Sequence, residues 1–187
     1  MQTPGVEVWE AMLHRYVTET NAQEKTKMAV GLASTTEDWV AQRLLGLATN
    51  ESVVRSQDYF SMLNNLAKSP WNTYLVWDYV RSHWEEMVDR FTLNNRYLGR
   101  MVKYVITRLS SPTHLNDVKE FFEQYPEAGS GARSRKQALE ELEGNIKWSL
   151  SIPPCTATSP PRLHVGNSVR RKTRQEPQSQ LRDREEE

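Results

Sequence analysis

The sequence predicts an all-α protein built as an α-solenoid, in which antiparallel helix pairs stack side by side. Apolar residues recur at three- and four-residue spacing through residues 1–148, and no segment shows the two-residue alternation typical of a half-buried strand. The helices and the loops between them are short, which favours stacked pairs. Since the sequence shows no repeat signature, a plain helical bundle is the alternative.

Local signals indicate where several helices begin. Thr35 followed by Asp38 resembles a capping box. Ser69 with Pro70 predicts a cap and a first helical position, and Asn94 or Asn95 can cap the following helix. With the apolar periodicity, these signals predict about eight helices, over 6–17, 22–34, 35–50, 56–69, 69–91, 95–109, 114–124 and 134–148.

The composition changes at about residue 149. Residues 1–148 form the predicted helical domain, whereas 149–187 contain five prolines, many hydroxyl residues and alternating charge. Such a segment cannot bury enough apolar surface to offset the entropy of ordering, so we predict a disordered tail. The run "RRKTR" at 170–174 could contact nucleic acid or act as a nuclear address, but its composition favours a solvated tail.

Charge and cysteine content exclude several classes. The 24 basic and 24 acidic residues balance, so no nucleic-acid partner is expected. The single cysteine, Cys155, excludes an internal disulfide and a zinc site built on cysteine pairs. No apolar run approaches the roughly 18 residues of a membrane helix, and the N-terminus does not resemble a signal peptide. As written, the chain is expected to be cytosolic unless it belongs to something larger.

Catalytic motifs are missing from the sequence. None of the four histidines lies in H-E-x-x-H, and there is no Gly-rich phosphate loop or G-x-S-x-G elbow. The segment "EAGSGARS" at 127–134 joins two helices and is typical of a helix C-cap and linker. We therefore predict no catalytic residue and no metal ligand. The sequon Asn50-Glu51-Ser52 makes Asn50 a glycosylation candidate.

A basic face is predicted on the helix after Asn95. On a helical wheel Arg96, Arg100 and Lys103 lie opposite the apolar side. Arg96 falls in the first turn, where the helix dipole disfavours a cation, and broken local rules are weak pointers to function. The face is either solvated or an anion site, and a guanidinium fork suits a carboxylate.

Three segments resemble the C-terminal helical domain of the gluzincin zinc aminopeptidases, of the glutamyl aminopeptidase, aminopeptidase N and laeverin type. They are "VWDYVRSHWEEMVDRF", "FTLNNRYLGRMV" and "FFEQYPEAGSGARSRKQALEELEGNIKW", and the resemblance covers most of 5–148. It implies ectoenzymes or lumenal proteins that remove N-terminal residues from peptides. It also implies zinc in an upstream domain, and a bowl of HEAT-like helix pairs that covers the active site.

The same resemblance implies roles for two arginines. Arg96 aligns with the arginine of the family's T-L-N-N-R, which contacts substrate, and Arg100 shares its face. The chain looks like a fragment without the zinc site, expected to be inactive alone, with a peptide substrate only in the full-length enzyme. Exposed apolar surface at Trp9, Trp39 and Trp71 would favour a homodimer or marginal stability. The alternative function is a free-standing helical scaffold that binds a protein or peptide.

Overall fold

A computed structural model describes residues 4–151, and these residues are helical throughout apart from short connections. They form nine α-helices and two 3₁₀ helices, with no strand in this range. The elements are α1 Pro4–Thr18, α2 Ala22–Ala33, α3 Asp38–Ala48, η1 Ser56–Asp58, α4 Tyr59–Leu66, α5 Thr73–Ser82, α6 Trp84–Phe91, α7 Arg96–Ile106, α8 Pro112–Gln124, η2 Gly129–Gly131 and α9 Ala132–Ser151. The predicted all-α class is confirmed.

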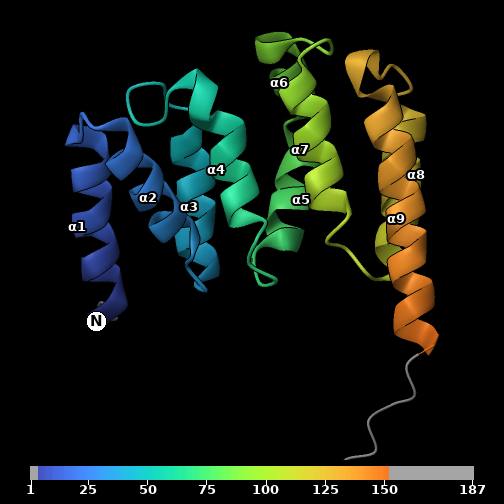
Figure 1. Cartoon of the computed structure of the whole chain (residues 1–187), viewed down its shortest axis with the longest axis horizontal. Helices are drawn as coiled ribbons and strands as arrows, with labels where there is room; N and C mark the ends of the chain where they lie inside the picture. The colour runs from blue at the N-terminus through green and yellow to red at the C-terminus, as the bar shows by residue number, and fades with distance from the viewer. Residues whose placement is uncertain (1–3, 152–187) are drawn as a thin grey trace, which may run out of the picture. The chain divides into compact units, whose positions relative to one another are not determined.

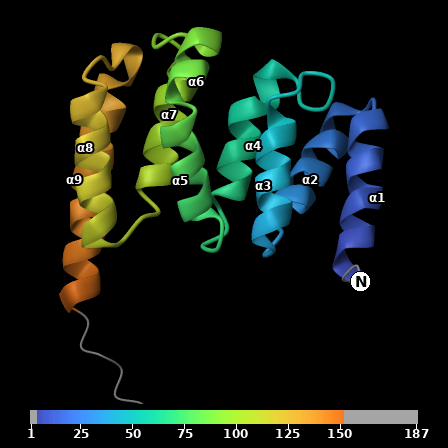
Figure 2. The same ribbon diagram turned by 180° about the vertical axis from the view of Figure 1, so that it is seen from behind.

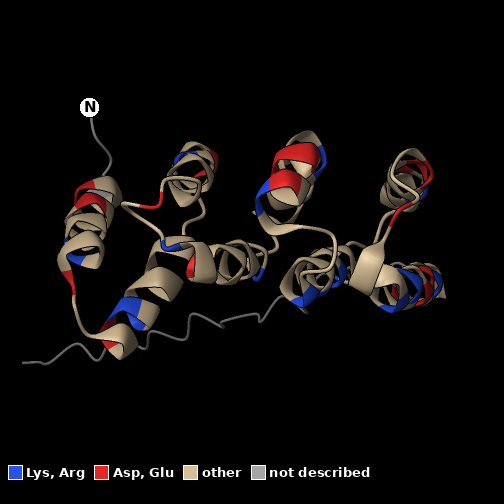
Figure 3. Ribbon diagram, turned by 90° about the horizontal axis from the view of Figure 1, so that it is seen from above, with Lys and Arg blue, Asp and Glu red and all other residues tan. Residues whose placement is uncertain are grey.

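The helices stand in two rows (Figures 1 and 2). Seen from above, α1, α3, α5 with α6, and α8 make one row, and α2, α4, α7 and α9 make the other (Figure 3). Neighbours within the second row contact one another, and each pairs with a helix of the first row: α1 with α2, α3 with α4, α5 with α7, and α8 with α9. Helix pairs therefore lie side by side, while their assignment to HEAT-like repeats stays a prediction.

One hydrophobic core runs between the rows, and α7 lies in its middle. The wheel predicted for this helix is confirmed, because its apolar side is at most 1% exposed at Leu98, Met101, Val102 and Val105. Leu109 is also buried, but it follows the end of the helix at Ile106. Burying each such side chain contributes about 1.5–3 kcal/mol to stability. That burial fixes the rotation of α7 about its axis and directs its cationic side chains outward.

Two predicted helix starts are wrong. Thr35 does not cap α3, because its hydroxyl accepts from the N–H of Glu37 at 3.1 Å and Glu37 takes the cap position without a side-chain bond. Pro70 lies in a turn closed by Asn72 and Thr73, whose N–H groups both donate to the carbonyl of Ser69, so α5 begins only at Thr73.

The single helix expected over 69–91 is interrupted at His83, which ends α5 and precedes α6. The imidazole stacks on Tyr79 with ring centroids 4.2 Å apart, and its Nδ1 lies 3.1 Å from the Tyr79 carbonyl oxygen. By contrast, the cap predicted at Asn94 or Asn95 is found at Asn95.

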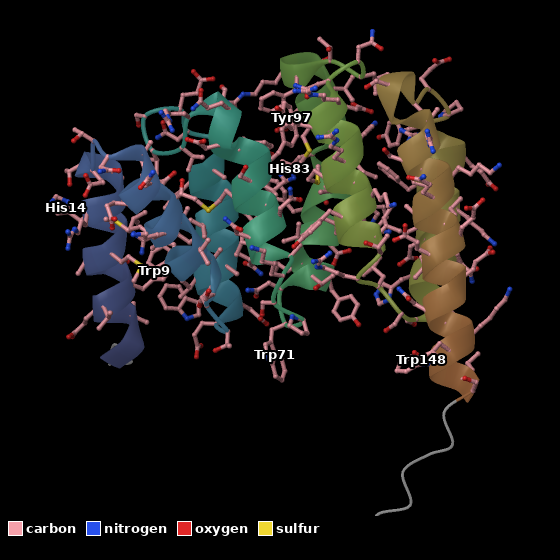
Figure 4. All side chains as sticks on the ribbon, in the orientation of Figure 1. Trp9, His14, Trp71, His83, Tyr97 and Trp148 are labelled. Atoms are coloured by element: carbon pink, nitrogen blue, oxygen red, sulfur yellow. The ribbon has the colours of Figure 1, made fainter. Side chains whose placement is uncertain are left out.

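Of the three tryptophans expected to be exposed, one is buried. Trp9 is 7% exposed, and its indole N–H donates to the carbonyl of Leu32 at 3.0 Å, which ties α1 to α2. Trp39 and Trp71 are 49% and 72% exposed, and Trp71 points away from the helices at the same edge as Trp148 (Figure 4). Association with a second copy stays a prediction.

The last helix, α9, extends past Trp148 to Ser151. The chain divides into two units, Met1–Pro153 and Pro154–Glu187, and every helix above belongs to the first. The predicted division at 148/149 stays a prediction, while Cys155, His164 and the run 170–174 lie outside the described residues. Within 4–151, no helix combines the length and the apolar character needed to cross a membrane.

Candidate functional site

The candidate site begins at the N-terminus of α7, where a short turn places Arg96. The side chain of Asn95 caps the helix by accepting from the N–H of Tyr97 at 2.9 Å. Thr92, which opens the turn, has φ 63° and ψ 149°. A β-branched residue in this region costs about 1–3 kcal/mol and persists only where its surroundings impose it. The backbone that leads into Arg96 is therefore held by its neighbours.

Those neighbours are the glycines of the α8–α9 turn. Gly129 has φ 49°, and a Cβ built on it would come within 2.6 Å of the carbonyl oxygen of Leu93. One turn into α7, a Cβ on Gly99 would lie 2.8 Å from the Cα of Gly131. The hydroxyl of Ser130 also donates to the Leu93 carbonyl, at 3.4 Å. The segment "AGSG" is thus more than the linker predicted from the sequence, because it braces the start of α7.

Arg96 and Arg100 are both exposed, and neither forms an ion pair within residues 4–151. The third predicted cation differs, since Lys103 is half-buried and pairs with Glu141 at 2.5 Å. Within the same range, neither Asp89 nor Glu123 forms an ion pair with Arg96. Two of the three cations on the face therefore keep their capacity to bind an anion.

The Arg96 guanidinium rests on its neighbour Tyr97. It lies 5.0 Å from the ring centroid and donates to the phenol oxygen at 3.1 Å. This hydrogen bond, followed by the charges of Arg96 and Arg100, lowers the pKa of Tyr97 below its ordinary value of 10.0. Tyr97 lies at the upper end of α7 in Figure 4. One donor of the guanidinium is used, and the planar group retains donors for a carboxylate.

A zinc site does not form within the described residues. No three His, Cys, Asp or Glu side chains there are close enough to hold a metal ion. His14 lies on the outside of α1, well apart from His83 (Figure 4), and His114 stacks on Tyr74 with centroids 4.5 Å apart. These residues do not fit the zinc that the family resemblance implies.

A buried arginine near the site was not predicted from the sequence. Arg135 is 8% exposed, and its guanidinium donates to the carbonyl oxygens of Tyr125 and Glu127. It also lies over the rings of Trp84 at 5.6 Å and Phe122 at 4.8 Å. Burial lowers its pKa. The signal that could have indicated it is its place on the apolar side of α9, three residues before Ala138.

Asn50 is exposed in the turn after α3. Its Oδ1 accepts from the N–H of Ser52 at 3.0 Å and from the Ser52 hydroxyl at 2.7 Å. The sequon therefore lies at the surface, in an Asx-type turn.

Comparison with known proteins identifies the helical part of the chain. The model of the ERAP1-like C-terminal domain family matches residues 1–144. The chain belongs to this family. Among curated proteins, it is 42% identical to glutamyl aminopeptidase of Bitis rhinoceros, 41% to aminopeptidase A of Gloydius brevicauda and 34% to glutamyl aminopeptidase of Homo sapiens, each over 149 residues.

Those 149 residues are 79% of this chain and 16% of each of the three relatives. The family predicted from the three sequence segments is thus confirmed. The chain spans about a sixth of the length of the relatives it matches, and what those whole proteins do comes to this chain only as a proposal.

Proposed function

We propose that this chain is the substrate-covering domain of a zinc-dependent aminopeptidase that removes N-terminal residues from peptides. In this function Arg96 binds an acidic side chain of the peptide, with Arg100 contributing to the same basic face. The observation that carries the proposal is the environment of Arg96. Its side chain is exposed and has no acidic partner within 4–151, and the backbone around it is held by close contacts with the α8–α9 turn. Zinc and the peptide bond to be cleaved belong to the rest of such an enzyme.

The brace supports this role physically. A guanidinium recognises a carboxylate through two parallel N–H···O bonds, which are sensitive to small displacements of the side chain. The Asn95 cap and the Gly99–Gly131 contact limit movement of the helix start that carries Arg96. Tyr97 beneath the guanidinium further restricts the side chain. The arrangement reduces the entropy that Arg96 would lose on binding a carboxylate.

The experiment that tests this places the matched 149 residues of the chain in the corresponding segment of glutamyl aminopeptidase of Homo sapiens. We measure kcat and KM for fluorogenic substrates with N-terminal Glu or Leu. The Arg96→Gln variant is expected to raise KM for the Glu substrate about tenfold or more, because a charge-assisted hydrogen bond is lost. The Leu substrate should be cleaved as before. Arg100→Gln should give a smaller effect in the same direction.

Arg108→Gln is the matched control. Arg108 is an exposed arginine just after the same helix, and its guanidinium lies over Tyr104 at 3.4 Å, away from the first turn. Its loss should leave both substrates unchanged. Equal losses on Glu and Leu substrates in Arg96→Gln would rule out recognition of an acidic side chain. The purified chain is assayed alongside with added zinc, and we expect no cleavage because its sequence lacks H-E-x-x-H.

Location follows from the same proposal. A protein of this kind would face the secretory lumen or the outside of the cell, where Asn50 could carry a glycan. Its exposure and its turn geometry support that assignment. The free-standing scaffold is the second candidate function, and the exposed state of Arg96 is compatible with it too. A homodimer is a further proposal, supported by the exposure of Trp39 and Trp71.

A further inference from the structure

A groove opens between α6 and the end of α8. It has a volume of about 380 Å³, which is within the range of small-ligand pockets. Its apolar lining comes from Trp84, Val88, Leu93, Tyr125 and Pro126. Three carboxylates stand around this lining, and they belong to Glu85, Asp89 and Glu127, with the amide of Gln124 beside them.

The carboxylates lack cationic partners. Glu85, Asp89 and Glu127 are exposed, and within residues 4–151 none of them forms an ion pair. Glu85 accepts one hydrogen bond, from the phenol of Tyr125 at 3.2 Å. Glu85 and Asp89 are four residues apart and share one side of α6. Negative charge is thus concentrated at one hollow without being neutralised.

The groove has a fixed frame. The buried Arg135 donates to the carbonyls of Tyr125 and Glu127, which sets the path of the chain along one wall. The other wall is α6, whose Trp84 packs edge-on against Phe121 with ring centroids 5.2 Å apart. Both walls are therefore held in part by buried contacts, including the wall that the exposed residues Pro126 and Glu127 contribute.

The groove and Arg96 lie on different rows of helices. In Figure 3 acidic residues mark α6 in the upper row, whereas basic residues mark α7 in the lower row. Leu93, which lines the groove, is in the turn that leads to Arg96. A ligand in the groove would contact α6 and the end of α8 rather than the basic face, and its binding does not require the proposed aminopeptidase function.

We propose that this groove docks an extended segment of a partner protein that carries an arginine or lysine side chain. The aliphatic stem of such a side chain would lie over Val88, Leu93 and Pro126, while its cationic end meets Glu85, Asp89 and Glu127. Arginine fits best, because its planar fork can bind a carboxylate bidentately and stack on the Tyr125 ring. Charge complementarity selects this partner over an acidic or purely apolar one.

The experiment is an NMR titration of the ¹⁵N-labelled full chain with three blocked tetrapeptides, Ac-Ala-Leu-Arg-Ala-NH₂ and its Gln and Glu counterparts. We expect saturable shifts of the amides of 84–89 and 124–127 with the Arg peptide only. The affinity should fall several-fold between about 20 mM and 300 mM salt, since exposed charges are screened. Asp89→Asn and Glu127→Gln should each weaken binding about two- to fivefold, and the double variant about tenfold.

Glu120→Gln is the matched control, because Glu120 is an exposed acid of α8 that does not line the groove. It should bind the Arg peptide like the parent chain, and dispersed spectra confirm that each variant is folded. Equal shifts with the Gln peptide, shifts confined to α7, or no saturable shift up to about 10 mM peptide would each overturn the proposal. Shifts that depend on protein concentration without peptide would assign the groove to a second copy of the chain and overturn it as well.

Discussion

The basic face of α7 and the acidic groove beside α6 present opposite charges, yet the same turn positions both. Two glycines of residues 125–131 contact the backbone near Arg96, because Gly129 lies against Leu93 and Gly131 lies against Gly99. The same turn borders the groove through Tyr125 and Glu127, whose carbonyls are held by Arg135. The turn is thus held in two different ways: close backbone contact fixes its glycines, and a buried guanidinium fixes its first residues.

The difference predicts which substitutions disturb each site. A contact between two glycine backbones is disturbed by adding a side chain, since any side chain forces the backbones apart. A contact made by a buried arginine is disturbed by removing that side chain, because the carbonyls then lack donors and a space is left between the aromatic rings. Truncating Arg135 should therefore destabilise the groove, and adding a side chain at Gly99 or Gly129 should destabilise the backbone that carries the basic face.

The largest effect is expected from Arg135→Ala. The substitution removes two donors to backbone carbonyls and the contacts with Trp84 and Phe122, so the free energy of unfolding should fall by about 2–4 kcal/mol. Urea unfolding followed by tryptophan fluorescence measures it. Arg133→Ala, two residues away and exposed, is the control and should stay within about 0.5 kcal/mol of the parent. A similarly small change in Arg135→Ala would mean that this arginine does not hold the groove.

An intermediate effect is expected from adding a methyl group at the glycine contact. Gly99→Ala would bring its Cβ to 2.8 Å from the Cα of Gly131, and Gly129→Ala also strains a backbone at φ 49°. Each should cost about 1–3 kcal/mol. Hydrogen exchange should show faster exchange at residues 96–98 and unchanged exchange in α3.

Gly144→Ala provides the comparison for these glycine variants. It lies inside α9 with no atom within 4 Å of an added Cβ, so alanine should be neutral or stabilise the chain by about 0.5–1 kcal/mol through its helix propensity. If Gly99→Ala behaved like Gly144→Ala, the contact between α7 and the turn would be loose, and Arg96 would not be braced by it.

Much of this molecule is predictable from local pattern. The buried side of α7 and its N-terminal cap follow from residues within one or two helical turns. The buried side was predicted correctly, and the cap predicted at Asn94 or Asn95 is Asn95. The family was also predictable, because "FTLNNRYLGRMV" and "EAGSGARS" carry it. The start of α5 was not, since Pro70 allows either a first helical position or a turn, and two bonds to the Ser69 carbonyl select the turn.

The features that depend on distant residues were missed. Trp9 is buried against the next helix, and its indole N–H donates to the carbonyl of Leu32, 23 residues away in sequence. The role of "AGSG" requires Leu93 and Gly99, from an earlier part of the chain, to lie against it. The acidic groove assembles carboxylates from α6 and from the turn after α8, and nothing in either segment alone indicates a hollow. Local periodicity specifies which side of a helix is buried, but not which helix covers it.

The smallest effect is expected in the ionisation of two tyrosines that report the charge of the two sites. The Arg96 hydrogen bond lowers the pKa of Tyr97, whereas partial desolvation and then the Glu85 carboxylate raise the pKa of Tyr125. In a ¹³C-tyrosine NMR titration, Tyr97 should therefore ionise at lower pH than Tyr125. Arg96→Gln should raise the pKa of Tyr97 toward 10.0 and leave Tyr125 unchanged, and Glu85→Gln should lower the pKa of Tyr125 alone. If the pKa values of both Tyr97 and Tyr125 changed in either variant, the two charged regions would be electrostatically coupled rather than separate.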